Sequence, residues 1–349
     1  MIKKLSFKII GFLGFLPLIF SSCHEATDYK NDIFGNFDAL VDIVDSRYCF
    51  FDEKDLNWRE TAAKYRELIN EDTDYIELFL ICSALLDELR DGHVNLTSDF
   101  TTSYYRKWWT DYPQDFDLRT LEEYYLGFNW FSTSGIMYRQ LEGEIAYMYY
   151  PSFSSGISEL SLDYILAILY NSRGLIIDIR NNGGGLLTNI DVLVGRLIDK
   201  EITGGYIMHK NGPGHDDFSE PYPIVYKPAG DKRVKWTGDV IVLTNRSCFS
   251  AANNFVSVVK KLPNVRIVGA RTGGGGGLPF TSELPVGWAL RFSACPILDA
   301  DMKSIEEGIE PTEGYEMHSP AEELAAGKDA ILDFAISLLK DNPLPEEED

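Results

Sequence analysis

One segment of the chain places a serine where it could act as a nucleophile. Ser250 stands between the apolar run Val240–Thr244, which has the pattern of a strand, and the helical run Ala251–Leu262. At the start of a helix, the helix dipole and free N–H groups favour negative charge, which suits an alkoxide and the tetrahedral oxygen beside it. Serine is also a common N-cap, and Ser247 is an equally good one, so capping and catalysis both remain open for Ser250.

A glycine-rich turn forms the second segment with possible chemistry. The apolar run Leu175–Ile179 leads into Asn181-Asn182-Gly183-Gly184-Gly185, and a helical pattern follows. Glycines allow positive φ and a close approach of substrate to the backbone, so N–H groups fixed in this turn could hold a developing oxyanion. Taken alone, the same turn could simply reverse the chain.

The third segment contains His93, which follows Asp91-Gly92. An imidazole titrates near neutral pH and could therefore take a proton from a serine hydroxyl. A single histidine in a turn is also often no more than a hydrogen-bonded structural residue.

In this order along the chain, the three segments resemble peptidase family S41, which includes the C-terminal processing peptidases and the tricorn-type proteases. The similarity rests on His93 in Asp-Gly-His, on Asp178-Ile-Arg-Asn-Asn-Gly-Gly-Gly185, and on Phe249-Ser-Ala-Ala252. It extends to Gly269-Ala-Arg-Thr-Gly-Gly274 and to Glu306-Glu-Gly-Ile-Glu-Pro311.

The resemblance implies a fold and a set of site residues. The fold would be α/β, a ClpP/crotonase-like core of parallel-rich strands and helices with a small N-terminal helical subdomain. Ser250 would be the nucleophile of a serine peptidase and His93 its general base, and Glu306 would orient the imidazole, with Glu307 as an adjacent competitor. The oxyanion would be held by the N–H of Ala251 together with that of Gly183 or Gly184.

Three departures from the family pattern bear on activity. The C-terminal processing peptidases use a lysine base after the Thr-Gly block, where this chain has Gly273–Gly277, so a Ser–Lys dyad is not expected. The tricorn-like branch places a serine before the histidine, where this chain has Gly92, and Asn253 replaces an acidic residue. These departures keep a second hypothesis open: a catalytically weak or inactive S41-type lipoprotein that binds a peptide, an apolar ligand or a glycan.

The glycine run itself carries a further prediction. Gly273, Gly274 and Gly275 could let an extended peptide approach the backbone and pair as an added strand, although a plain flexible loop is an equally good interpretation. The substrate expected for the enzyme is a peptide or an unfolded protein, with no cofactor.

Apolar periodicity predicts the elements that position these residues. Helical spacing starts at Phe37 and continues in 58–69 and 75–89, where Gly92 is expected to end the helix. From residue 143, strand patterns at 145–150, 175–179, 240–244 and 265–268 alternate with helical patterns at 160–170, 189–197 and 251–262, which predicts largely parallel strands. Residues 201–237 have the composition of a surface excursion, and Ser319-Pro-Ala-Glu322 is a capping box that opens a C-terminal helical region.

Six segments describe the predicted domain organisation. They are a signal peptide (1–22), a tether (23–32), the helical subdomain (33–98), an aromatic-rich bridge (99–142), the catalytic core (143–341) and an acidic tail (342–349). The bridge aromatics could pack on the core or form a platform that stacks on sugars.

Composition and the N-terminal residues limit the partners. The 349 residues carry 32 basic and 54 acidic side chains, and the net charge of −22 argues against nucleic acid as a partner. Five scattered histidines and five cysteines without C-x-x-C spacing argue against a metal site. Lysines, a short apolar run and Ser-Ser-Cys23 resemble a bacterial lipobox, which predicts export, lipidation at Cys23 and a location in the cell envelope, at the outer membrane or the periplasmic face; oligomeric state is left open.

Overall fold

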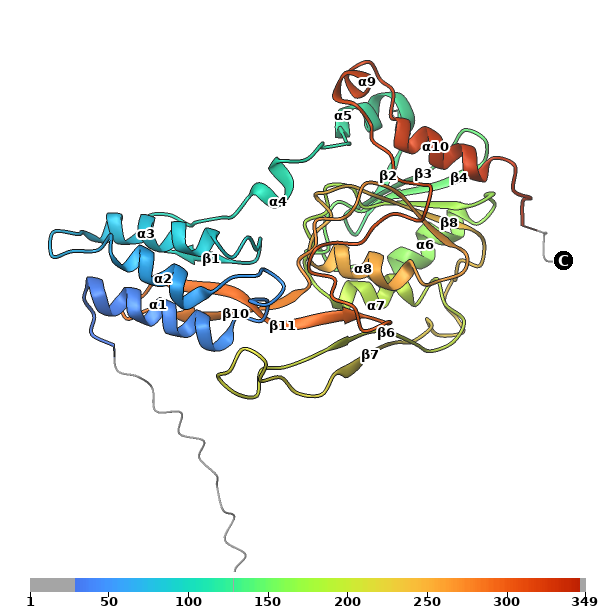
Figure 1. Cartoon of the computed structure of the whole chain (residues 1–349). Coiled ribbons are helices and arrows are strands. Elements are labelled where there is room, and N and C mark those ends of the chain that lie inside the picture. Colours follow the sequence, from blue (N-terminus) through green and yellow to red (C-terminus); the bar gives the residue numbers. More distant parts are fainter. Residues whose placement is uncertain (1–28, 128, 346–349) are drawn as a thin grey trace, which may run out of the picture.

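The computed structural model describes residues 29–345 except residue 128 (Figure 1). The predicted signal peptide, the predicted lipidation site Cys23 and most of the predicted tether lie outside these residues, as do the last four residues of the predicted acidic tail. Within the described part, no helix is both long enough and apolar enough to cross a membrane.

The helical region consists of α1 (Ile33–Arg47), α2 (Trp58–Arg66) and α3 (Tyr75–Asp87), as the apolar spacing predicts. Asp32, Asn57 and Asp74 cap these helices through their side chains, and Asp74 forms a capping box with Glu77. The helix before the Asp-Gly-His motif ends earlier than expected. It stops at Asp87, and Arg90 rather than Gly92 has the positive φ of 50°.

The core is built on a six-stranded sheet with the order β2-β3-β4-β5-β8-β9. The strands β4 (Ile145–Tyr149), β5 (Leu175–Asp178), β8 (Val240–Thr244) and β9 (Val265–Gly269) are parallel, which confirms the α/β prediction. The hairpin β2 (Phe131–Thr133) and β3 (Ile136–Leu141) extends this sheet antiparallel to β4, so part of the predicted bridge belongs to the core.

Helices cover both faces of this sheet. One face packs against α6 (Glu159–Leu169), α7 (Thr188–Val194) and α8 (Ala251–Val259). The other packs against the π-helical turn η1 (Leu121–Leu126) and α10 (Ala330–Leu339), and Figure 1 shows α10 on the opposite side of the sheet from α7 and α8. Two short helices, α4 (Lys107–Thr110) and α5 (Leu118–Thr120), lie in the bridge between the two regions.

A second sheet joins the helical region to the core. Its strand order is β1-β11-β6-β7, and β10 (Gly277–Glu283) pairs with β11 (Ala289–Asp299). In Figure 1, β10 and β11 run from the core to the helices, where Trp288, Leu290 and Phe292 pack into the helical core. β1 (Asn95–Thr97) follows His93 and pairs with β11, so this sheet positions the histidine.

Two predictions about segments outside the six-stranded sheet were wrong. Residues 201–237 are only in part a surface excursion, because β6 (Ile202–Ile207) and β7 (Tyr222–Tyr226) belong to the second sheet. Ser319 does not cap the short helix α9 (Ala321–Ala325), which has no side-chain cap. Its hydroxyl instead donates to Asp329 and accepts from the N–H of Ile331 at the start of α10.

Candidate active site

The backbone of Ser250 adopts a conformation that few residues other than glycine adopt. Its φ is 56° and its ψ is −119°, at the junction between the turn after β8 and the first residue of α8. Such a conformation persists only where the surroundings fix it. Here the Ser250 N–H donates to the Gly274 carbonyl at 2.9 Å, and the Gly273 N–H donates to the Cys248 carbonyl at 2.7 Å. The serine side chain makes no capping bond, so the alternative interpretation of Ser250 as an N-cap does not hold.

His93 lies against this serine although 157 residues separate them in the sequence. Its Nε2 is 3.0 Å from the Ser250 Oγ, and its ring packs against Phe249 with 4.6 Å between the centroids. The His93 N–H donates to Asp91 Oδ1 at 2.7 Å, which anchors the turn that carries the imidazole.

The electrostatic setting keeps this imidazole neutral. Burial lowers the pKa of His93 to about 4. The Asp91 carboxylate raises this pKa, and the positive charge of Arg291 lowers it further. A neutral ring whose Nε2 accepts the Ser250 proton carries its own proton on Nδ1. Among the described residues, no hydrogen-bond partner reaches that buried Nδ1.

Glu306 lies deep in the site, and among the described residues no hydrogen bond joins it directly to the imidazole. Its Oε1 is 3.1 Å from the Lys54 ammonium and its Oε2 accepts the Gly276 N–H at 2.8 Å. Burial and the neighbouring Asp91 raise the pKa of Glu306 to about 8, while Lys54 opposes that rise. Glu307, the predicted competitor, has an exposed carboxylate that binds the same lysine at 2.7 Å.

The position of Gly92 explains why a serine before His93 is absent. A Cβ at Gly92 would lie 2.6 Å from Trp108 Nε1 and 2.9 Å from Phe249 Cζ. Trp108 comes from α4 and stacks on Phe249 at 4.2 Å, so aromatic rings fill the space that a serine side chain would need.

The glycine-rich turn meets Ser250 through Gly184. This residue has φ +94°, and a Cβ on it would lie 2.8 Å from the Ser250 Cβ and 2.9 Å from the Ala251 nitrogen. Its N–H donates to Asn182 Oδ1 at 3.0 Å and is therefore occupied. Gly183 is exposed, and between residues 29 and 345 no acceptor pairs with its N–H or with that of Ala251. Of the two glycines predicted for the oxyanion hole, Gly183 has the available N–H.

The run Gly273–Gly277 differs from the prediction of a surface open to a peptide. All five glycines are buried. The N–H groups of Gly273, Gly275 and Gly276 bind Cys248, the Glu306 carbonyl and the Glu306 carboxylate. The run supports Ser250 and Glu306 from behind and leaves these three N–H groups unavailable to an added strand.

Comparisons with known proteins show the family of this chain. The model of peptidase family S41 matches residues 144–314, and that of the tricorn protease C1 domain matches residues 29–87. A solved structure of a putative peptidase from Parabacteroides merdae is 42% identical, with a TM-score of 0.84 over 89% of this chain and 97% of that one. This chain belongs to peptidase family S41.

Two curated relatives of this S41 chain are a tricorn protease and a carboxy-terminal processing protease. The tricorn protease of Thermoplasma acidophilum is 30% identical over 58% of this chain and 17% of its own length. The carboxy-terminal processing protease CtpA of Bacillus subtilis is 28% identical over 40% of this chain and 28% of its own length. The chain thus matches less than a third of either relative.

Sequence reasoning missed several residues of this S41 site. Asp91 could have been found, because it belongs to the Asp-Gly-His motif. Its carboxylate accepts hydrogen bonds from the His93 N–H and, at 2.7 Å, from Ser293 Oγ. Lys54 and Trp108 could not have been found, because neither belongs to a motif. Asn253, the departure on α8, binds the Ile305 carbonyl at 2.9 Å and so helps to hold the segment before Glu306.

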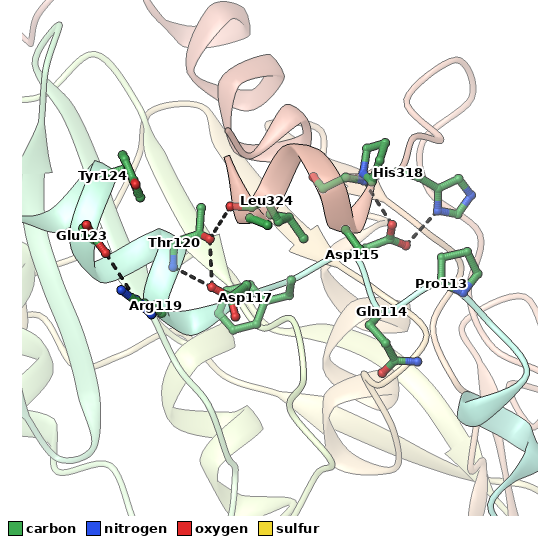
Figure 2. Close-up of a pocket in the computed structure, with 15 residues that line it drawn as sticks. Pro113, Gln114, Asp115, Asp117, Arg119, Thr120, Glu123, Tyr124, His318 and Leu324 are labelled. Atoms are coloured by element: carbon green, nitrogen blue, oxygen red, sulfur yellow. Dashed lines mark hydrogen bonds and ion pairs between the residues drawn. The ribbon is translucent and has the colours of Figure 1, made fainter. Parts of the chain in front are cut away.

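The cavities around this S41 core include one beside the site and one away from it. One of about 450 Å³ borders the site and is lined by Lys54, Trp108, Arg246 and Glu307 among others. Figure 2 shows another of about 810 Å³ between α5 and α9, where His318 Nδ1 lies 2.7 Å from Asp115 Oδ2. None of the predicted site residues lines this second cavity. Within residues 29–345, no three His, Cys, Asp or Glu side chains are grouped to hold a metal ion.

Proposed function

We propose that the chain is a serine peptidase that cleaves peptides or unfolded proteins through Ser250 and His93. The observation that carries this proposal is the 3.0 Å contact between His93 Nε2 and Ser250 Oγ at a strained strand-to-helix turn. A nucleophile and base within hydrogen-bond reach are the geometry that acyl transfer requires.

In the first step, Ser250 Oγ attacks the substrate carbonyl carbon while its proton passes to His93 Nε2. The carbonyl oxygen becomes an oxyanion, for which the N–H groups of Gly183 and Ala251 are the available donors. When the C–N bond breaks, His93 gives the proton to the leaving amine. Water then attacks the acyl-enzyme in the same manner and restores Ser250.

The imidazolium formed during attack needs negative charge nearby. Asp91 contacts the backbone of His93 and its charge raises the pKa of the ring. Glu306 makes no hydrogen bond with the ring, so it would act on the Nδ1 proton through water. Both carboxylates would stabilise the charged form of His93.

A peptide library distinguishes this proposal from background hydrolysis. We expect Ser250→Ala and His93→Ala each to lose at least about 10³-fold in kcat/KM, because nucleophile and base act as a unit. Ser247→Ala is the matched control, since Ser247 is the neighbouring serine and lies outside the proposed mechanism. Equal cleavage by wild type and the two site variants would refute the assignment.

One observation favours the second hypothesis, a weakly active or inactive binding protein. The buried Nδ1 of His93 has no acceptor among residues 29–345, and burial makes the ring a weak base. Binding of library peptides by all variants without any product would support it. Export, the lipid anchor at Cys23 and the envelope location stay predictions from the sequence.

A further inference from the structure

A lysine from the helical region lies among the buried carboxylates near the candidate site. Lys54 belongs to the segment between α1 and α2, and its ammonium lies 3.1 Å from Glu306 and 2.7 Å from Glu307 in the core. The side chains of Lys54 and Glu306 are only 6% and 3% exposed, so water screens this pair poorly.

We propose that Lys54 is a positioning residue that holds Glu306 in place and favours the ionised form of its carboxylate. The inference rests on the proposed serine peptidase function and adds a residue from outside the motifs of the core. Lys54 would act through Glu306, since it does not reach the reacting atoms.

The groups around Glu306 show why a cation is needed there. The groups near Glu306 are Asp91 itself and the residues close to either carboxylate, namely Tyr48, Cys49, Lys54, Gly276, Ser293 and Glu307. Two of them are carboxylates, and Asp91 is buried like Glu306. Two carboxylates that share a buried site cannot both ionise easily, and one of them takes up a proton unless an opposite charge is close.

Arg291 is the other cation near the histidine, and it serves a different part of the site. Its guanidinium donates to the His93 carbonyl at 3.2 Å and to Asn95 Oδ1 at 3.3 Å, and its charge lowers the pKa of His93. Among residues 29–345, the cation that forms a salt bridge with Glu306 is Lys54 and not Arg291.

Each oxygen of the Glu306 carboxylate has its own partner. Lys54 binds one oxygen and the Gly276 N–H binds the other, so the carboxylate is fixed from two sides. An ionised carboxylate only accepts hydrogen bonds, whereas a protonated one also donates. Loss of Lys54 would therefore free one Glu306 oxygen and shift the group further toward its protonated form, which is a weaker acceptor for the Nδ1 proton.

A fluorophosphonate probe, which labels activated serines, tests this without knowledge of the substrate. We would measure the labelling rate of the full chain from pH 5 to 10 for wild type, Lys54→Gln and Lys54→Arg. Lys328→Gln removes an exposed lysine paired with Glu323 and is the matched control. The wild-type rate should rise to a plateau as Glu306 ionises near pH 8.

For Lys54→Gln we expect this rise to move upward by at least about one pH unit, with labelling at pH 7 about tenfold slower. Lys54→Arg and Lys328→Gln should keep the wild-type profile. An unchanged profile in Lys54→Gln would overturn the role of Lys54 alone. Labelling of Ser250→Ala at the wild-type rate would instead overturn the proposed function.

Lys54→Gln leaves one buried carboxylate without its counter-charge, and a second variant covers the case in which this variant does not fold. Lys54→Gln/Glu306→Gln removes both members of the pair and should label without a rise near pH 8. A rise that persists there in the double variant would overturn the proposal.

Discussion

At the scale of single residues, the site depends on a backbone contact that leaves no room for a side chain. Gly184 lies directly on the Ser250 turn, and it adopts φ +94°. A methyl group there would meet Ser250 Cβ at 2.8 Å and the Ala251 nitrogen at 2.9 Å, next to a proposed oxyanion donor. The close packing of Gly184 on the Ser250 turn therefore requires glycine at this position.

We predict that Gly184→Ala lowers kcat/KM by about 10²-fold or more, because it displaces the Ala251 N–H from the oxyanion. The substitution should cost about 1–3 kcal/mol of stability through strain and overpacking. Gly230→Ala is the matched control, since a Cβ at Gly230 meets no atom within 4 Å. Peptide cleavage and urea unfolding measure both effects, and full activity in a folded Gly184→Ala would contradict this account.

At the scale of elements, the apolar patterns of the sequence predicted the parallel strands and helices of the core but not the strands of the second sheet. The runs at Leu175 and Val240 are apolar strands followed by turns, so β5, β8 and the helix at Ala251 could be read from the sequence. The strands β6, β7, β10 and β11 were not predicted. β10 and β11 are neighbours in the chain, but β11 also pairs with β1 and β6, which are distant from it, and strand formation depends on such partners.

The same limit applies to the site. Ser250, His93 and Gly183 were found because each belongs to a local motif, and the structure brings His93 to Ser250. The contact of Lys54 with Glu306 arises only when the helical region packs on the core, and no spacing in the sequence encodes it. Gly273–Gly277 was misjudged because glycine permits a buried turn as readily as an open one.

The short helix α4 provides the next prediction, since its Trp108 takes the space beside Gly92. Restoring the family serine with Gly92→Ser should slow fluorophosphonate labelling about tenfold, because the new side chain would collide with Trp108 and Phe249. The double variant Gly92→Ser/Trp108→Ala should recover part of the rate by freeing that space. Faster labelling in Gly92→Ser alone would show that the hydroxyl completes a proton path despite the crowding.

At the scale of the whole molecule, buried charges that join its two regions link stability to pH. Lys54 and Glu306 meet between the helical region and the core, and Asp91 and His93 lie beside them. Two of these groups titrate far from their ordinary range, and in opposite directions, because burial disfavours the charged form of each. The dependence of folding on pH therefore reports on this junction.

The pKa shifts of His93 and Glu306 change stability with pH in opposite directions. The pKa of His93 falls from 6.5 to about 4, so the unfolded chain binds an extra proton between these values and stability rises with pH there. The pKa of Glu306 rises from 4.5 to about 8, so the folded chain holds the extra proton and stability falls as pH rises through that range. Between pH 6.5 and 8, only the Glu306 effect remains.

We therefore predict that the free energy of unfolding decreases by up to about 2 kcal/mol from pH 6.5 to 8, at about 1.4 kcal/mol per proton and pH unit. Glu306→Gln should remove most of this decrease, because glutamine does not titrate. Glu307→Gln is the matched control. Lys54 lowers the pKa of Glu307, which is ionised in both states above pH 6.5, so that variant should keep the wild-type slope. Urea unfolding at several pH values measures all three, and equal slopes in wild type and Glu306→Gln would show that Glu306 already ionises in the folded protein at pH 6.5.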